Sequence, residues 1–259
     1  MSIDVLNGEK ISKFLSFSAP IEVLEQIDST NKYLKAKASA LPQGAAVIAN
    51  AQTEGRGRYD RVFYSPENCG IYMSVLLRPE VSAKDAVLIT AAAAVCVCEA
   101  IEKLFGKKCG IKWVNDILLD SKKICGILAE SVINPQKGKI ERTVVGIGIN
   151  VYPPQNGFDK EIKDIAGFVT EERKENLRNI LCAEIINRMV DYANNIGKKE
   201  FLDKYRSRSI VVGKRINVVS DDGLIPATAI LIDEDCRLLV EYDDKRREYL
   251  NSGEIGIKL

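Results

Sequence analysis

The sequence contains no histidine, carries almost no net charge and lacks long hydrophobic runs. Among 259 residues there are 37 lysines and arginines against 36 acidic residues, a net charge of +1. Without histidine there can be no Ser-His-Asp triad, Cys-His pair or histidine metal site. A net charge so close to zero provides no overall field for steering toward nucleic acid, so any anion site must be local.

Targeting signals are also missing from the sequence. No apolar run is long enough to span a bilayer, and the first ten residues, MSIDVLNGEK, lack the basic and apolar regions of a signal peptide. The seven cysteines are odd in number and follow no disulfide or metal-ligand spacing. We therefore expect free thiols, a cytoplasmic location and no membrane partner.

The first 207 residues alternate between strand patterns and helix patterns. Strands are expected over 21–27, 45–51, 70–77, 109–114, 117–119, 123–133 and 140–151, and helices over 9–17, 30–40, 84–105, 171–195 and 198–205. The connections between the later strands are short and rich in Asn, Asp and Gly, which indicates an antiparallel meander. This pattern predicts an α+β fold with a mixed or antiparallel sheet covered by helices on one face.

The composition changes after Ser207. Short strands are expected over 210–219, 225–232, 237–242 and 246–250, separated by Asp-rich turns. Such a pattern is typical of a small all-β unit of SH3-like size. We therefore expect two domains, residues 1–207 and 208–259.

One segment without strand or helix periodicity, residues 51–66, reads AQTEGRGRYDRVFYSP. Its three arginines supply planar groups of donors for phosphate or carboxylate oxygens, and its two glycines let the backbone approach a ligand closely. A Gly-Arg-Gly-Arg run taken alone is more often a solvated turn. Together with the segments described next, it predicts a loop that wraps an anion.

Three further segments give that loop a context: KWVND at 112–116, KKICGILAE at 122–130 and GIGIN at 146–150. Each has an ordinary explanation as a turn, a solvated hairpin tip or a bulge. Lys123, however, enters an apolar strand, so its ammonium should lie at the end of the sheet. Gly126, Gly146 and Gly148 remove side chains from neighbouring strands. The combination predicts a trough for a flat ligand with an anionic end.

These motifs (STN, GRGR…SP, KWxND, KxxGIL.E and GIGINV), in this order, resemble those of the biotin–protein ligases over residues 21–259. The resemblance implies a class II synthetase-like catalytic domain followed by an SH3-like β-barrel. It implies an enzyme that forms biotinyl-5′-AMP from biotin and ATP with Mg²⁺, then transfers biotin to a lysine of a biotin carboxyl carrier domain. The short N-terminus resembles the form without a DNA-binding domain, so no specific DNA binding is expected.

The resemblance also assigns roles to individual residues. Lys123 and Arg58 would be catalytic. Biotin would be bound by Ser29, Thr30, Asn31, Gln52, Gly55, Arg56, Gly57, Arg58, Lys123 and Gly126. ATP or the adenylate would be bound by Arg58, Arg61, Phe63, Lys112, Asn115, Asp116, Ile127 and Asn150. The metal ligands and the base for the acceptor lysine stay open, with Asp116 a candidate base. Asp60 stands where the family usually has glycine, and its carboxylate should weaken the local positive potential.

Two rival functions are weighed against this one. Lipoate ligases and octanoyl transferases resemble the same fold, but they carry a histidine-containing motif that this chain lacks. A non-catalytic nucleic-acid-binding module could also use the arginine segment, but the near-zero net charge and the lack of aromatic interleaving around that segment argue against it. Analogy with the family also suggests a homodimer formed through a sheet edge.

Overall fold

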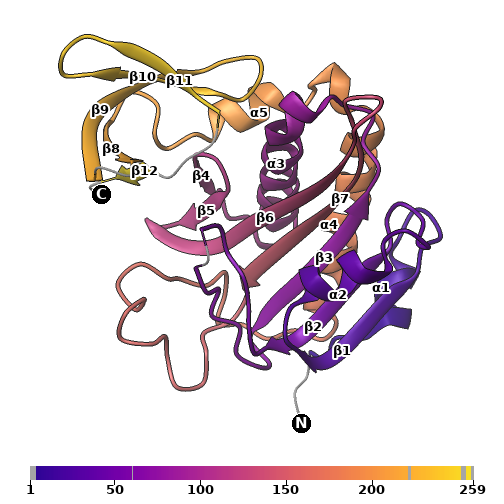
Figure 1. Cartoon of the computed structure of the whole chain (residues 1–259). Helices are drawn as coiled ribbons and strands as arrows, with labels where there is room; N and C mark the ends of the chain where they lie inside the picture. The colour runs from indigo at the N-terminus through magenta and orange to yellow at the C-terminus, as the bar shows by residue number, and fades with distance from the viewer. Residues whose placement is uncertain (1–3, 60, 221–222, 252–254, 258–259) are drawn as a thin grey trace.

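A computed structural model describes residues 4–59, 61–220, 223–251 and 255–257. A seven-stranded sheet forms the centre of the molecule, with strand order β1-β2-β3-β7-β6-β5-β4 (Figure 1). Its strands are β1 (Ile21–Ile27), β2 (Ala46–Gln52), β3 (Gly70–Leu77), β4 (Gly110–Lys112), β5 (Asp116–Leu119), β6 (Lys122–Asn134) and β7 (Lys139–Asn150). β1 and β2 are parallel and every other neighbouring pair is antiparallel, so the mixed sheet and the meander are confirmed.

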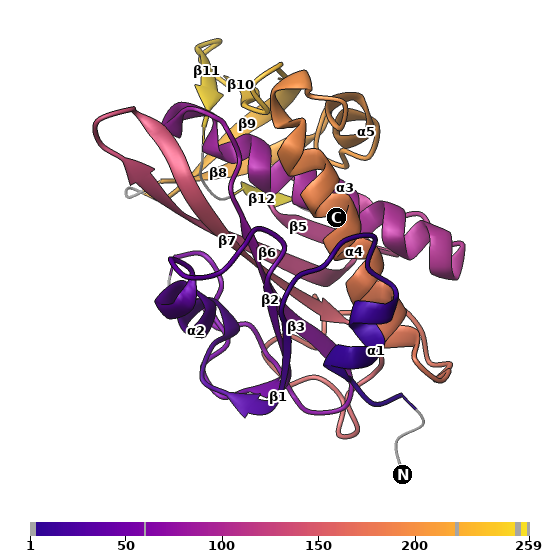
Figure 2. The same cartoon turned by 90° about the vertical axis from the view of Figure 1, so that its right-hand side faces the viewer.

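Helices cover both faces of this sheet rather than one. Figure 2 shows α2 (Thr30–Lys37) on one side, and α3 (Ala86–Phe105) and α4 (Leu177–Asn194) on the other. The reason lies in the two-residue period of β2: Val47 belongs to the cluster that packs against α2, whereas Ala46 and Ile48 belong to the larger core. Because β2 and β3 are buried along almost their whole length, both of their faces need a covering layer.

A second, smaller sheet follows the two short helical segments after α4. It is antiparallel, with strand order β11-β10-β9-β8-β12. Its strands are β8 (Arg215–Ser220), β9 (Gly223–Ile232), β10 (Leu238–Tyr242), β11 (Arg247–Leu250) and β12 (Ile255–Ile257). Trp113 Nε1 donates to the Cys236 carbonyl at 2.9 Å, so the loop after β4 is tied directly to this sheet.

Several predicted boundaries differ from the structure. The helix expected from residue 171 begins at Leu177, because residues 171–176 include no apolar side chain to bury and Asn176 is left-handed, with φ 60°. The helix expected over 198–205 becomes a 3-10 turn (Ile196–Lys198) followed by α5 (Leu202–Ser207), with left-handed Lys199 between them.

The remaining differences concern the ends of elements. α1 (Gly8–Lys13) ends earlier than expected, and a 3-10 turn (Ala83–Asp85) precedes α3. β4 and β8 are shorter than the expected strands 109–114 and 210–219. All seven cysteines are free and buried, as expected from their positions in apolar segments.

Candidate active site

A cavity of about 260 Å³ opens between the N-terminus of α2, the arginine segment and the faces of β6 and β7. The predicted site residues converge there from segments far apart in the sequence. Those that line the cavity are Ser29, Thr30, Asn31, Gln52, Arg56, Gly57, Arg58, Arg61, Phe63, Lys112, Asn115, Asp116, Lys123, Gly126, Ile127 and Asn150. Every proposed site residue except Gly55 therefore lies at this one cavity, while the role of each stays a prediction.

Gly55 does not line the cavity but belongs to a small hairpin formed by the arginine segment. Phe63 N donates to the Gly55 carbonyl at 2.8 Å, and Gly57 N donates to the Arg61 carbonyl at 2.7 Å. A Cβ at Gly55 would lie 2.3 Å from the Phe63 carbonyl oxygen, so only glycine fits. The role of Gly55 is therefore to permit the hairpin, which we call the arginine hairpin (Gly55–Phe63). Asp60, the departure from the family pattern, lies outside the described residues.

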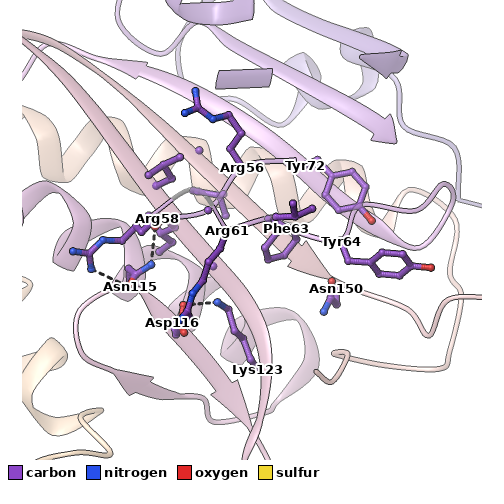
Figure 3. A pocket seen from close by; sticks show the side chains of 18 of the residues that line it. Arg56, Arg58, Arg61, Phe63, Tyr64, Tyr72, Asn115, Asp116, Lys123 and Asn150 are labelled. Atoms are coloured by element: carbon purple, nitrogen blue, oxygen red, sulfur yellow. Dashed lines mark hydrogen bonds and ion pairs between the residues drawn. The ribbon is translucent and has the colours of Figure 1, made fainter. Parts of the chain in front are cut away.

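The arginines of this hairpin differ in direction. Arg58 points toward Asn115, whose Oδ1 accepts from Arg58 Nη1 at 3.3 Å (Figure 3). Arg61 points toward the side of the cavity where Asp116 and Lys123 lie, whereas Arg56 points the opposite way (Figure 3). Asn115 is itself fixed, because its Nδ2 donates to the Ile127 carbonyl at 3.0 Å. The guanidinium groups of Arg58 and Arg61 therefore lie on the side of the cavity where the Asn115 amide is held in a fixed position.

Lys123 has a carboxylate partner that its position at the end of the sheet did not indicate. Its Nζ lies 2.7 Å from Asp116 Oδ1, and both side chains are partly exposed to the cavity. The two residues meet because β5 and β6 pair with Asp116 opposite Gly126. An incoming anion would compete with Asp116 for the ammonium, so the pair holds Lys123 in place while leaving it able to exchange partners.

The glycine-lined trough is narrower than expected, because side chains from elsewhere enter it. A Cβ on Gly148 would lie 2.4 Å from Phe63 Cε1, and one on Gly146 would lie 2.3 Å from Asn31 Oδ1. The three glycines line the cavity as predicted. Part of the space they leave is occupied by the Phe63 ring and the Asn31 amide.

At the N-terminus of α2 the cavity has a polar end, lined by uncharged hydroxyl and amide groups, and the charge of Arg56 reaches Glu130, the partner of Asn31. Thr30 N, at the start of α2, donates to Gln52 Oε1 at 2.9 Å. Ser29, Thr30 and Asn31 are almost completely buried. The helix N-terminus therefore already has a protein acceptor, and the hydroxyl and amide groups around it face the cavity.

Several lining residues were missed in the sequence. They include Tyr64, Tyr72, Leu128, Ile162, Ile165, Ala166 and Ile255. The segment around Ile165 read only as a loop-rich connection, yet Lys123 N donates to the Ile165 carbonyl at 2.7 Å, which places the segment beside β6. Its apolar residues at 162, 165 and 166 were the available signal. Ile255 comes from β12, so the small sheet also reaches the cavity.

The chain offers few groups for a protein-held metal. Among the described residues that line the cavity, Asp116 is the only carboxylate, and no three His, Cys, Asp or Glu residues gather at one point in the described chain. A divalent cation could meet Asp116 here, but the protein alone does not build a complete coordination shell. In the same described residues, no helix combines the length and apolar character needed to cross a membrane.

Comparison with known proteins places this cavity in a family. Residues 23–150 match the Biotin/lipoate A/B protein ligase family, and residues 211–257 match the Biotin protein ligase C terminal domain. The chain belongs to the biotin protein ligase family. The two matched segments correspond to the large sheet with its cavity and to the small sheet.

Individual members of the biotin protein ligase family are similar along most of the chain. The bifunctional ligase/repressor BirA of Bacillus subtilis is 34% identical over 78% of this chain and 63% of its own length. The biotin--[acetyl-CoA-carboxylase] ligase of Mycobacterium tuberculosis is 29% identical over 85% of this chain and 83% of its own. This chain thus spans less than two thirds of the length of the Bacillus relative.

A solved structure agrees with the fold. The biotin protein ligase from Aquifex aeolicus in complex with biotin and ATP has a TM-score of 0.73 and 27% identity, covering 92% of this chain and 97% of the other. The large mixed sheet and the small C-terminal antiparallel sheet are therefore the architecture of this ligase family.

Proposed function

We propose that the chain is a biotin–protein ligase, which makes biotinyl-5′-AMP from biotin and ATP and transfers biotin to a lysine of a biotin carboxyl carrier domain. The observation that carries the proposal is the polarity of the cavity. Thr30, Asn31 and Gln52 line its polar end with uncharged groups, while Arg58, Arg61 and Lys123 supply cationic groups where Asn115 and Asp116 lie, and Arg56 points the other way. Biotin has the same division, with a neutral ureido ring at one end and a carboxylate at the other.

The related Aquifex protein supports this assignment, because its structure is described as a complex with biotin and ATP. In the first step a biotin carboxylate oxygen bonds to the α-phosphorus of ATP, and the bond to pyrophosphate breaks. Negative charge accumulates on oxygens, so Lys123 and Arg58 would act by position and charge. Mg²⁺ would neutralise phosphate charge when it is bound with the nucleotide, and Asp116 is the carboxylate placed to meet it.

In the second step the acceptor amine attacks the biotinyl carbonyl, an amide bond forms, and AMP leaves with the former anhydride oxygen. We propose a division of the chain into a catalytic domain (1–207) and a C-terminal β domain (208–259), with Ile255 as the contribution of the latter to the cavity. We also propose a cytoplasmic location, homodimer formation through a sheet edge and no specific DNA binding. In residues 4–20, α1 is a single six-residue helix, too little for a recognition helix and its support.

The nearest alternative function is the transfer of a lipoyl or octanoyl group in place of biotin, since the matched family includes lipoate ligases. Lipoate and octanoate have no N–H donors, so neither could donate to the Thr30 hydroxyl oxygen, which lines the cavity, whereas the ureido N–H groups of biotin could. This polar end therefore favours biotin.

The test is covalent modification of an isolated biotin carboxyl carrier domain, followed by intact mass. We expect a single biotinyl group on the acceptor lysine only when the chain, biotin and ATP are all present. A carrier domain whose acceptor lysine is replaced by arginine is the control. Modification with lipoate or octanoate at the same rate as with biotin would overturn the assignment.

A further inference from the structure

A chain of hydrogen bonds runs beneath the polar end of the cavity, from α2 and β6 to the arginine hairpin. Glu130 lies between Lys35 Nζ, 2.6 Å from its Oε1, and Asn31 Nδ2, 2.9 Å from its Oε2. The Asn31 Oδ1 lies 2.6 Å from Ser74 Oγ, which in turn lies 2.8 Å from Thr30 Oγ1. Glu130 and Ser74 do not line the cavity, so the site described above gives them no role.

The charge of Glu130 sets the direction of these bonds at one end. Burial raises the pKa of Glu130, but hydrogen bonds from Lys35 and Asn31, together with the charges of Lys35 and Arg56, outweigh it and leave that pKa below its usual value. An ionised carboxylate only accepts, so the NH₂ group of Asn31 must face Glu130 and its carbonyl oxygen must face Ser74. Ser74 has one proton, and Asn31 Oδ1 has none to give. That proton therefore goes to Asn31, leaving the Ser74 oxygen as an acceptor for Thr30.

The other end of the chain is fixed in the same way. The Ser65 hydroxyl donates to the Phe63 carbonyl at 2.8 Å, so its oxygen must accept from Gln52 Nε2 at 3.1 Å. Gln52 therefore turns its Oε1 toward Thr30, 3.2 Å from the hydroxyl oxygen. Both protein neighbours of the Thr30 hydroxyl are then acceptors, and its single proton is used by one of them.

We propose that Glu130 and Ser74 are positioning residues that fix Thr30 Oγ1 as an acceptor toward the cavity, so that this end selects a ligand N–H group. The inference rests on the proposed function, in which that donor is one of the two ureido N–H groups of biotin. Ser74 is fully buried and Thr30 nearly so, which protects the arrangement from competing water. Glu130 acts through Asn31 and Ser74 without touching the ligand.

Calorimetric measurement of the binding of biotin and of two analogues to the full chain tests whether Thr30 accepts a hydrogen bond from the ligand. Each analogue is a lactam in which CH₂ replaces one ureido N–H, which removes a donor while adding little bulk. The variants are Ser74→Ala and Glu130→Gln, with Glu141→Gln as the control, since Glu141 is exposed on the neighbouring strand β7 and outside this chain of bonds. Thermal unfolding of each variant verifies that it is folded.

We expect both variants to weaken biotin binding by about five- to thirty-fold, the usual effect of losing one partner of a buried hydrogen bond. One of the two analogues lacks the N–H that meets Thr30, so its hydrogen bond to Thr30 is already missing. For that analogue we expect the two variants to change the affinity by less than about twofold. Equal weakening of biotin and both analogues, or unchanged biotin binding in both variants, would overturn the inference while leaving the proposed function intact. No biotin binding by the parent chain would refute the proposed function itself.

Discussion

Lys123 has a carboxylate partner in the ligand-free protein and would need to exchange it for the reacting oxygens. Its Nζ is 2.7 Å from Asp116 Oδ1, and both groups line the cavity. Removing the ammonium would take away its attraction to the reacting oxygens. It would also leave the Asp116 carboxylate, without its Lys123 partner, facing an anionic ligand. The loss should appear in the chemical step because the charge on the reacting oxygens increases there.

We predict that Lys123→Ala keeps the fold but loses about 2–4 kcal/mol of transition-state stabilisation for adenylation, roughly 30- to 1000-fold in rate. Single-turnover formation of biotinyl-AMP measures this. Lys122→Ala is the matched control, because Lys122 is the adjacent lysine and its ammonium donates to the Asp164 carbonyl instead. A Lys123→Ala rate close to that of the control would exclude Lys123 from the mechanism.

At the residue scale, the sequence identified Lys123 but not its ion pair with Asp116. Seven positions separate the two residues, and they meet only through the register of β5 and β6. Phe63 illustrates the same limit. The family resemblance assigned it to the adenylate, while its place over Gly126 and Gly148 depends on the hairpin that carries it. Residue types and spacings can be read from the sequence, whereas contacts between distant segments become visible only in the fold.

At the scale of elements, the arginine hairpin has few apolar contacts outside Phe63. Tyr59 is 60% exposed and Val62 is 80% exposed, so backbone bonds and the contact of Arg58 with Asn115 hold much of the tip. Segments with so little burial open readily. A bound adenylate would provide oriented acceptors for the arginines and so stabilise the closed hairpin.

We predict that Arg58→Gly releases biotinyl-AMP faster than the parent chain, because the arginine hairpin loosens while Lys123 remains to support adenylation. Biotin should then appear on the lysines of an added bystander protein, measured by its intact mass. Arg246→Gly is the control. Arg58 Cζ lies 5.1 Å from the Tyr59 ring centroid and Arg246 Cζ lies 4.4 Å from that of Tyr242, but Arg246 is in the turn between β10 and β11. If Arg58→Gly causes no more bystander biotinylation than this control, the arginine hairpin does not retain the adenylate.

The elements themselves were largely predictable where hydrophobic periodicity was strong. β1 and β3 begin and end at the predicted residues because apolar runs and turn residues mark both ends. The sequence did not reveal that α2 covers the opposite face of the sheet, since both faces of β2 are apolar and either could take a helix. The segment around Ile165 was also missed as part of the site, because its bond with Lys123 is made by backbone groups, which carry no sequence signal.

For the whole molecule, the proposed activity depends on bringing distant segments to one cavity. The N-terminus of α2, the arginine hairpin, the β5–β6 hairpin and Ile255 of the small sheet all line it. Ser29 and Ile255 are separated by most of the chain. The cavity, with its uncharged polar groups and its cationic groups, therefore does not exist before the sheet is assembled. The sequence motifs indicated the chemistry, and the sheet order explains why they meet.

Activation of a biotin carboxylate with ATP is the step that we propose for this cavity, and exchange of labelled pyrophosphate into ATP measures it. We expect exchange that requires biotin, with neither lipoate nor octanoate able to substitute for it. Because exchange needs no carrier domain, the result is independent of which acceptor the chain uses. Exchange supported equally by lipoate or octanoate, or no exchange with biotin and Mg²⁺-ATP by the folded chain, would contradict the proposed activity.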